Sequence, residues 1–189
     1  MKNYKILFFI VLMGFAVNAQ KYTNTENTNV TKEWNGVTFS STKSFAENIA
    51  EASNLSQMKK VLENKTTLKA LETEEMVTVF AITNNGFTKL QAKQDSIFDR
   101  SKANLLTTII KYHVIPGRVD SHSIKNAIKR SNGTAYFATL EGEKLGIKEE
   151  NGQLVLVDVE GNTSVILATD FYHKNGFFHI VDGIVLPEM

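Results

Sequence analysis

Cysteine is absent from all 189 residues of the chain. Its absence excludes disulfide bonds, thiolate nucleophiles and zinc sites built on cysteine ligands. It also removes the residue to which bacteria attach lipid directly after an export signal. The fold must therefore be stabilised by packing alone.

An excess of either charge is absent as well. The formal net charge is +1, from 21 basic and 20 acidic residues, which gives no basis for binding nucleic acid or an anionic membrane. Hydrophobic residues make up 42% of the chain and charged residues 22%, as is ordinary for a globular protein that buries a core. The length leaves room for one ordinary domain and a tail.

Signatures of catalysis and of nucleotide binding are also missing. No serine lies in a Gly-x-Ser-x-Gly elbow, and the chain has no glycine-rich loop of the P-loop or dinucleotide type. Asp170 and Asp182 could be the two carboxylates of a glycoside hydrolase, although Asp170 lies at the end of an expected strand. We expect no enzymatic activity.

Histidine, the commonest metal ligand and acid–base group, occurs four times. His113 and His122 flank Asp120, but their spacing fits no zinc signature and crosses a Pro-Gly turn. His173 and His179 each lie near an aspartate in the sequence. A metal site is the less favoured interpretation, and we expect neither a metal nor another cofactor.

The N-terminal residues have the features of an export signal. Two lysines precede an apolar stretch, residues 6–16, that is too short to span a bilayer, and residues 17–19 are small enough for a signal peptidase to read. We expect residues 1–19 to be removed and the mature chain to begin at Gln20. The protein is then secreted or periplasmic, with no stable membrane anchor.

Residues 20–43 are rich in polar side chains and predict a flexible lead, with a possible added strand near Trp34–Phe39. Trp34 could dock on the edge of the domain together with Val37 and Phe39. The alternative is that Trp34 is exposed and stacks on a ligand.

The rest of the chain divides into a helical half and a stranded half. Apolar residues at three- and four-residue spacing predict helices near residues 45–52, 55–62, 68–71, 84–90, 102–112 and 124–128. Short apolar runs between glycine-containing turns predict strands at residues 76–83, 135–138, 144–147, 154–157, 164–167 and 177–187. This order, with a strand at each end to close the sheet, indicates a single α+β domain over residues 44–189.

Three motifs, in order, resemble the signature of the fasciclin-type (FAS1) domain family. They are Thr-Val-Phe-Ala-Ile-Thr-Asn at 78–84, Tyr-His-Val-Ile-Pro-Gly at 112–117 and Asn-Gly-Phe-Phe-His-Ile-Val-Asp at 175–182. The resemblance covers about residues 45–187. It implies that a helical N-terminal half packs on a β-sandwich or wedge formed mainly by the C-terminal half. The positions that it implies to be structural are Thr78, Val79, Phe80, Ala81, Thr83, Asn84, Phe87, Tyr112, His113, Pro116, Gly117, Asn175, Gly176, His179 and Asp182.

The chain departs from the family pattern at a few motif positions. Ile82 stands where proline is usual, Asn85-Gly86 replaces a Glu-Ala pair, and Val181 replaces an isoleucine. Because glycine costs up to about 1 kcal/mol relative to alanine within a helix, Gly86 predicts a less stable short helix.

The resemblance also implies an exported binding module for a surface or matrix protein or a polysaccharide. In animal members, the Tyr-His segment and an Asp-Ile pair are linked to receptor adhesion. Tyr112 and His113 match the first, and Asp170 matches the aspartate of the second, with Phe171 in place of isoleucine. These four residues are interaction candidates, although core and turn positions are the favoured interpretation. The alternatives are a carrier of an apolar small molecule and, less favoured, a carboxylate-based hydrolase.

Overall fold

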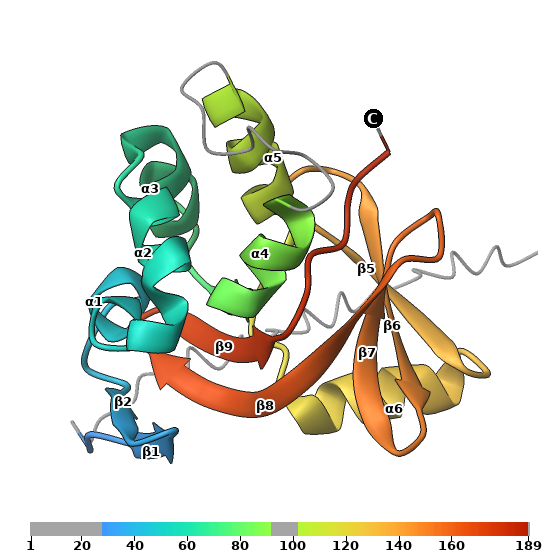
Figure 1. Cartoon of the computed structure of the whole chain (residues 1–189). Coiled ribbons are helices and arrows are strands. Elements are labelled where there is room, and N and C mark those ends of the chain that lie inside the picture. Colours follow the sequence, from blue (N-terminus) through green and yellow to red (C-terminus); the bar gives the residue numbers. More distant parts are fainter. Residues whose placement is uncertain (1–27, 92–101, 189) are drawn as a thin grey trace, which may run out of the picture.

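The computed structural model describes residues 28–91 and 102–188, which form the helices and strands drawn in Figure 1. The predicted export signal and Gln20 lie outside the described residues. The prediction of an α+β fold is confirmed, because helices pack against a large mixed sheet.

The helices gather mainly in the first half of the described chain. They are α1 (Phe45–Ala50), the 3-10 turn η1 (Ser53–Leu55), α2 (Ser56–Leu62), α3 (Lys65–Glu72), α4 (Asn84–Gln91), α5 (Ala103–Tyr112) and α6 (Ser121–Arg130). Ser44, Asn64 and Asp120 each accept a hydrogen bond from a backbone N–H in the first turn of α1, α3 and α6, respectively. These side chains satisfy backbone donors that a helix start otherwise leaves unpaired.

The strands are β1 (Thr31–Trp34), β2 (Val37–Ser40), β3 (Val77–Ile82), β4 (Val114–Pro116), β5 (Thr134–Ala138), β6 (Lys144–Glu150), β7 (Gln153–Val157), β8 (Thr163–His173) and β9 (Gly176–Val181). β1 and β2 form a hairpin, and the other seven described strands form one sheet in the order β4-β3-β9-β8-β7-β6-β5. β3 and β9 pair in parallel, so the first and third motifs lie side by side.

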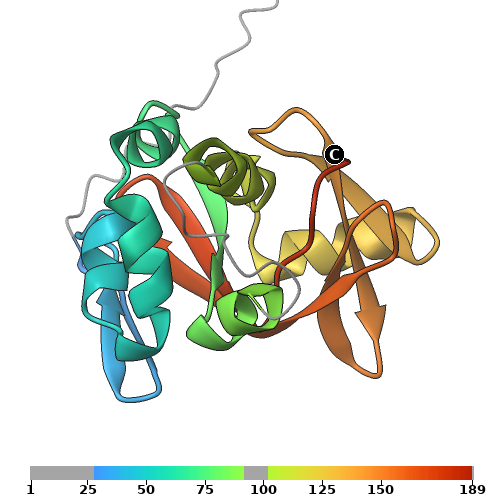
Figure 2. The same cartoon turned by 45° about the horizontal axis from the view of Figure 1, so that its top comes forward.

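The core lies around this central parallel pair. Every residue of β3 and of β9 is buried, as expected for strands covered on both faces. Figures 1 and 2 show α1 to α5 gathered over the β3–β9 end of the sheet, whereas α6 lies beside β5, β6 and β7. The three motifs therefore meet in the interior, and the hairpins of the C-terminal half extend away from it.

A glycine is required where the third motif enters β9. Gly176 has φ +153°, and a Cβ built on it would lie 1.8 Å from the Val77 carbonyl oxygen. No other residue leaves room for β3 at this distance. The Asn-Gly turn predicted at this position thus also permits the close parallel pairing.

Close packing explains why a glycine stands at position 86, and the sequence did not indicate this. Gly86 is buried in α4, and a Cβ there would lie 2.7 Å from Ile82 Cγ2 and 3.2 Å from the Gly183 backbone. The small residue allows α4 to dock closely. The packing gained in this way offsets the low helix propensity of glycine.

Residues 31–40 form a packed hairpin where the sequence predicted a flexible lead with at most one added strand. Asn35 and Gly36 have φ of 49° and 77°, the left-handed pair that a two-residue hairpin turn requires. Phe39 is buried, and its ring centroid lies 5.2 Å from that of Phe171 and 5.1 Å from that of Phe178. One Asn-Gly turn and one aromatic anchor therefore make this segment part of the packed unit.

Candidate functional site

Tyr112 and His113, the first pair of interaction candidates, lie at the end of α5 and are buried in the core. His113 Nδ1 donates to the Ile109 carbonyl oxygen (2.8 Å), and Nε2 accepts a long hydrogen bond from the Val185 N–H (3.4 Å). Tyr112 Oη donates to the Lys144 carbonyl oxygen (3.1 Å). Burial lowers the pKa of His113 to about 4 and raises the pKa of Tyr112 to about 12. Both side chains are neutral at pH 7, and neither is accessible to a partner in the folded chain.

Asp170 and Phe171, the second pair, lie where β8 is irregular. Asp170 has φ +59°, and its carboxylate accepts from the N–H (2.7 Å) and the hydroxyl (2.5 Å) of Ser121 and from the hydroxyl of Thr169 (3.0 Å). Burial alone would raise the pKa of Asp170, but the hydrogen bonds from Ser121 hold it below its usual range. Phe171 is buried, with its ring stacked on Phe178 at 5.0 Å. Of the four candidates, only Asp170 remains partly exposed.

His179 lies next to Asp170, so Ser121, Asp170 and His179 are close together. The Nδ1 of His179 accepts from the Asp170 N–H (3.1 Å), and its Nε2 donates to the Val119 carbonyl oxygen (2.9 Å). Both ring nitrogens are thus occupied by backbone groups, so neither can take a proton from Ser121, whose hydroxyl donates directly to Asp170. Among Ser121, His179 and Asp170, the base–nucleophile contact that a serine hydrolase requires is therefore not formed.

Other motif residues connect segments that are distant in the sequence. Thr78 Oγ1 donates to the Gly117 carbonyl oxygen and accepts from the Val119 N–H, both at 2.8 Å. Asn84 Oδ1 accepts from the Gln57 N–H at the start of α2 (2.9 Å). The aliphatic and aromatic members of the first motif and its helix are buried: Val79, Phe80, Ala81 and Phe87. Pro116 ends β4 and is exposed.

The third motif makes similar connections. Asp182 Oδ1 accepts from the Val165 N–H (2.9 Å), and Oδ2 pairs with the Lys89 ammonium (3.1 Å). Asn175 Nδ2 donates weakly to the carbonyl oxygens of Leu71 and Glu74, each at 3.4 Å. Its side chain thereby holds the end of α3 against the β8–β9 turn.

Metal binding and membrane spanning find no support in the described residues. Residues 28–91 and 102–188 contain no group of three or more histidine, aspartate or glutamate side chains placed to hold a metal ion. Among the helices formed by these residues, none is both long and apolar enough to cross a bilayer.

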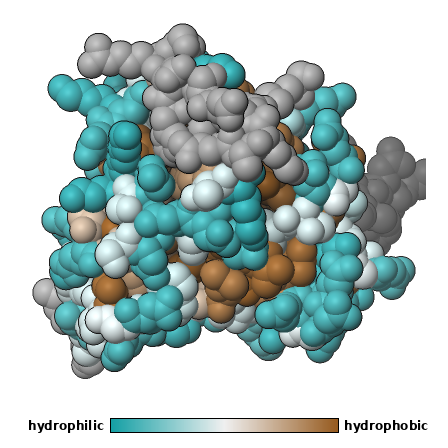
Figure 3. Space-filling view, in the orientation of Figure 1, coloured by the Kyte–Doolittle hydropathy of each residue, from teal (hydrophilic) through white to brown (hydrophobic). Residues whose placement is uncertain are grey.

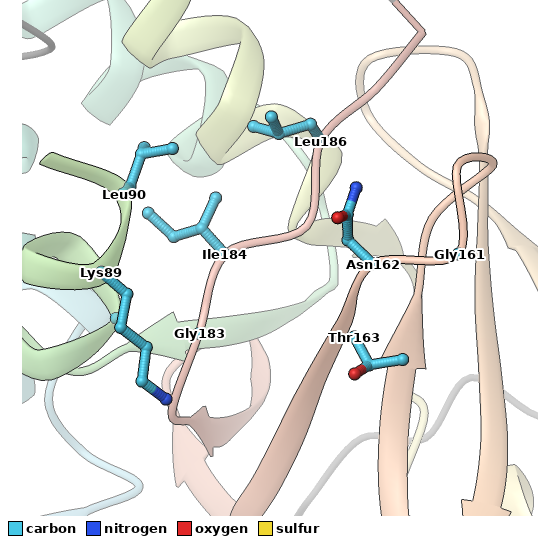
Figure 4. A pocket seen from close by; sticks show the side chains of 9 residues that line it. Lys89, Leu90, Gly161, Asn162, Thr163, Gly183, Ile184 and Leu186 are labelled. Atoms are coloured by element: carbon cyan, nitrogen blue, oxygen red, sulfur yellow. The ribbon is translucent and has the colours of Figure 1, made fainter. Parts of the chain in front are cut away.

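A pocket of about 600 Å³ lies between α4, the turn before β8 and the segment after β9 (Figure 4). Leu90, Ile184 and Leu186 form an apolar side, and Asn162 and Thr163 form a polar side. Its size is in the range of about 300–1,000 Å³ that is usual for small-molecule sites. The apolar side could hold an apolar molecule.

A second hollow, of about 540 Å³, lies near the rim of the sheet, and the sequence reasoning missed it. It is lined by Tyr136, Gly142, Glu143, Lys144, Val159 and Glu188. Tyr136 and Val159, at 65% and 60% exposure, are the most exposed large hydrophobic side chains among the described residues. Strand alternation in the predicted strand at 135–138 was the available signal, since it places Tyr136 on the face opposite to its neighbours.

A hydrophobic area lies in the lower middle of the face seen in Figure 3. Leu167, in β8, is 47% exposed. Hydrophilic residues surround this area, so the surface carries apolar groups at more than one place.

Known proteins are similar to this chain in sequence and in fold. The sequence profile of the fasciclin domain family matches residues 53–187. The protein sll1483 of Synechocystis sp. is 30% identical over 65% of this chain and 61% of its own length, and human periostin is 28% identical over 77% of this chain and 16% of its own. A solved FAS1 domain pair from the insect cell adhesion molecule Fasciclin I covers 70% of this chain at a TM-score of 0.55 and 20% identity. The match spans 45% of that solved chain, so this chain covers less than two thirds of each of these proteins. With its profile match over most of its length, the chain belongs to the fasciclin domain family.

Proposed function

We propose that the chain is an exported, non-enzymatic binding module that recognises a protein or a polysaccharide at the cell surface or in the extracellular matrix. The observation that carries the proposal is that the reactive side chains form hydrogen bonds within the fold. The buried histidines, Ser121 and Asp170 are held by hydrogen bonds within the fold, whereas large hydrophobic side chains remain on the surface. The solved relative is a cell adhesion molecule, which supports the same class of function.

The hydrolase alternative has less support than binding. Asp170 and Asp182 are the carboxylates that a glycosidase would use. Asp170 accepts hydrogen bonds from Ser121 and Thr169, and Asp182 is bonded to the Val165 N–H and to Lys89. Both carboxylates thus serve to join segments of the fold.

The proposal places recognition on the exposed surface, away from most of the residues that the family resemblance suggested. Tyr112, His113 and Phe171 are buried, so a partner could touch them only after local unfolding. Asp170 is partly exposed, but its oxygens already accept three hydrogen bonds. Exposed side chains outside the motifs, such as Tyr136, are better placed to contact a partner.

A capture experiment tests this function. The mature chain, immobilised in native and in heat-denatured form, is exposed to envelope and matrix extracts of the source organism. The extracts are used untreated, after protease digestion and after periodate oxidation. Retention by the native form that protease abolishes identifies a protein partner, and retention that periodate abolishes identifies a polysaccharide. Equal recovery on native and denatured chain would contradict the proposal.

The pocket beside α4 favours a second candidate function, a carrier of an apolar small molecule. A ligand that binds only the folded state stabilises it, so palmitic acid should raise the melting temperature of the wild-type chain. Leu186→Glu places a charge in the apolar lining and should abolish the shift, whereas Leu167→Glu, on the exposed part of β8, should retain it. No shift with the wild-type chain would exclude a fatty-acid carrier.

A further inference from the structure

Tyr136 presents an aromatic ring to solvent at the rim of the sheet. It lies in β5, the last strand in the sheet order, and is 65% exposed. Its neighbour Ala135 is buried, so strand alternation points Tyr136 to the opposite side. Exposing so large an apolar group costs hydration free energy unless something else covers it.

The Tyr136 ring packs over a glycine of the neighbouring strand β6. Gly146 is the cross-strand partner of Tyr136, and Val157 is the cross-strand partner of Gly146. A Cβ on Gly146 would lie 3.2 Å from Tyr136 Cε1 and 2.6 Å from Val157 Cγ1. Both side chains therefore close over the glycine backbone, which positions the ring before any ligand arrives. A tyrosine held in this way offers a large contact area at low entropic cost.

Polar groups of both kinds surround the ring. Glu143 lies in the turn between β5 and β6, Lys144 begins β6, and Glu188 lies near the C-terminus. Glu143 Oε2 accepts a hydrogen bond from the Glu188 N–H (2.8 Å), which joins the two sides of the hollow. Within the described part of the chain, Tyr136 Oη and Lys144 Nζ make no hydrogen bond, so both remain available to a ligand.

We propose that Tyr136 and this hollow form a subsite for a neutral hexopyranose residue of a polysaccharide. The inference rests on the proposed binding function and names its ligand. The C–H groups on one face of a pyranose ring are apolar and carry partial positive charge, and they pack on the negative face of an aromatic ring. The sugar hydroxyls donate to the carboxylates of Glu143 and Glu188 and accept from the Lys144 ammonium.

The arrangement of charges selects against ligands with one fixed charge. Two carboxylates and an ammonium line the same hollow, so an anion or a cation meets attraction and repulsion together. A hydroxyl both donates and accepts, and it satisfies either kind of group. Because β5 is the end strand, a longer sugar chain can continue past the edge of the sheet.

Calorimetric titration of the mature chain with neutral hexasaccharides of glucose, mannose and galactose tests the subsite. At least one of them should bind the wild-type chain. Tyr136→Ala should lower its affinity by about tenfold or more, equivalent to about 1.4 kcal/mol, and Tyr136→Phe should retain it. Leu167→Ala, which removes an exposed apolar side chain elsewhere, should bind as wild type does. Equal melting temperatures check that all variants are folded.

Three results would overturn the subsite. They are no binding of any hexasaccharide to wild type, equal binding by wild type and Tyr136→Ala, and binding that disappears at about 1 M NaCl, where charged contacts are screened within about 3 Å. The second leaves polysaccharide binding standing at another site. The first, combined with capture of a protease-sensitive component from the extracts, leaves the binding function standing with a protein partner. The proposed function itself fails only if the native chain captures nothing that the denatured chain does not.

Discussion

Acidification should destabilise this protein through its buried histidines, and His113 is the most informative one to test. The His113 ring is fully buried, with Nδ1 donating to Ile109 and Nε2 facing the Val185 N–H. Protonation would place a second ring hydrogen on Nε2, against that N–H and away from water. Burial therefore lowers the pKa of His113 to about 4 from an ordinary value of 6.5.

The sign and size of the effect follow from this pKa difference. Because the folded-state pKa is the lower one, the unfolded chain binds more protons between about pH 6.5 and pH 4. The stability that the neutral ring provides is complete above pH 6.5 and is lost as the pH falls toward 4. At about 1.4 kcal/mol per pKa unit, the loss is about 3 kcal/mol. His173, whose pKa burial also lowers to about 4, adds a loss of the same order over the same range.

Replacing His113 should remove its contribution to the pH dependence of the free energy of unfolding. At pH 7, His113→Ala removes the ring donor to the Ile109 carbonyl oxygen, which keeps only the backbone N–H of residue 113 (3.2 Å), and removes the acceptor of the buried Val185 N–H. This loss costs about 1–3 kcal/mol, and the void that the substitution opens costs more. At acid pH the variant no longer carries the titrating group. Its deficit relative to wild type should therefore shrink by up to about 3 kcal/mol as the pH falls through this range. His122→Ala, an exposed histidine in α6, is the control and should follow wild type.

Urea unfolding monitored by circular dichroism, at about pH 7, 5.5 and 4.5, gives the free energies needed. The same pH dependence for wild type and His113→Ala would refute the buried, neutral state of the ring. A variant with wild-type stability at pH 7 that fails to bind an identified partner would instead assign the family's adhesive role to His113.

Three further predictions can be checked by standard measurements. Phe80→Ala should lower the free energy of unfolding by about 3–5 kcal/mol, because Phe80 is fully buried and stacked on His179 at 5.4 Å; a denaturant midpoint equal to that of wild type would exclude a core role. Gly86→Ala should destabilise the fold by about 1–3 kcal/mol through overpacking against Ile82, instead of stabilising α4 by up to about 1 kcal/mol; a raised midpoint would show that the strand gives way. N-terminal sequencing of the exported protein should begin at or next to Gln20, and recovery of residues 1–5 would contradict the export signal.

The central strands could be predicted from the sequence because their burial is visible in it. Val77 to Ile82 carry no charge, and all six are buried as the run predicted. The outer ends of β8 and β9 could not be predicted in the same way. The sequence predicted a strand at residues 164–167 and placed Asp170 at a strand end. β8 instead continues through Asp170 to His173, and Ser121, distant in sequence, satisfies the Asp170 carboxylate.

The end of β9 could not be predicted from the sequence either, and here the predicted strand was too long. An apolar run to residue 187 predicted a longer strand, but β9 ends at Val181. Asp182 turns to accept the Val165 N–H, and the Gly183 N–H donates to Ser164 Oγ at 2.9 Å. Periodicity along one segment contains no information about such partners, so it located β8 and β9 but missed where they end.

The candidate sites were harder to predict than the fold because residue type does not determine exposure. The sequence directed attention to Tyr112 and His113, whose chemistry is used to pair with backbone carbonyl oxygens in the interior. It gave no prominence to Tyr136, because a tyrosine in an alternating strand is unremarkable until the opposite residue is known. Gly146, across the strand pair, is what makes room for that ring.

The motif residues stabilise the fold, and this has a consequence for where binding specificity arises. Thr78, Asn84, Asn175 and Asp182 all form hydrogen bonds that join distant segments. These bonds stabilise the fold. A relative that is 30% identical can share this framework and bind something different, provided that its surface differs. Tyr136 lies outside all three motifs, on an exposed strand that the framework holds in place. Specificity particular to this chain is therefore to be sought on such positions, where a substitution changes the surface without removing a bond that the fold requires.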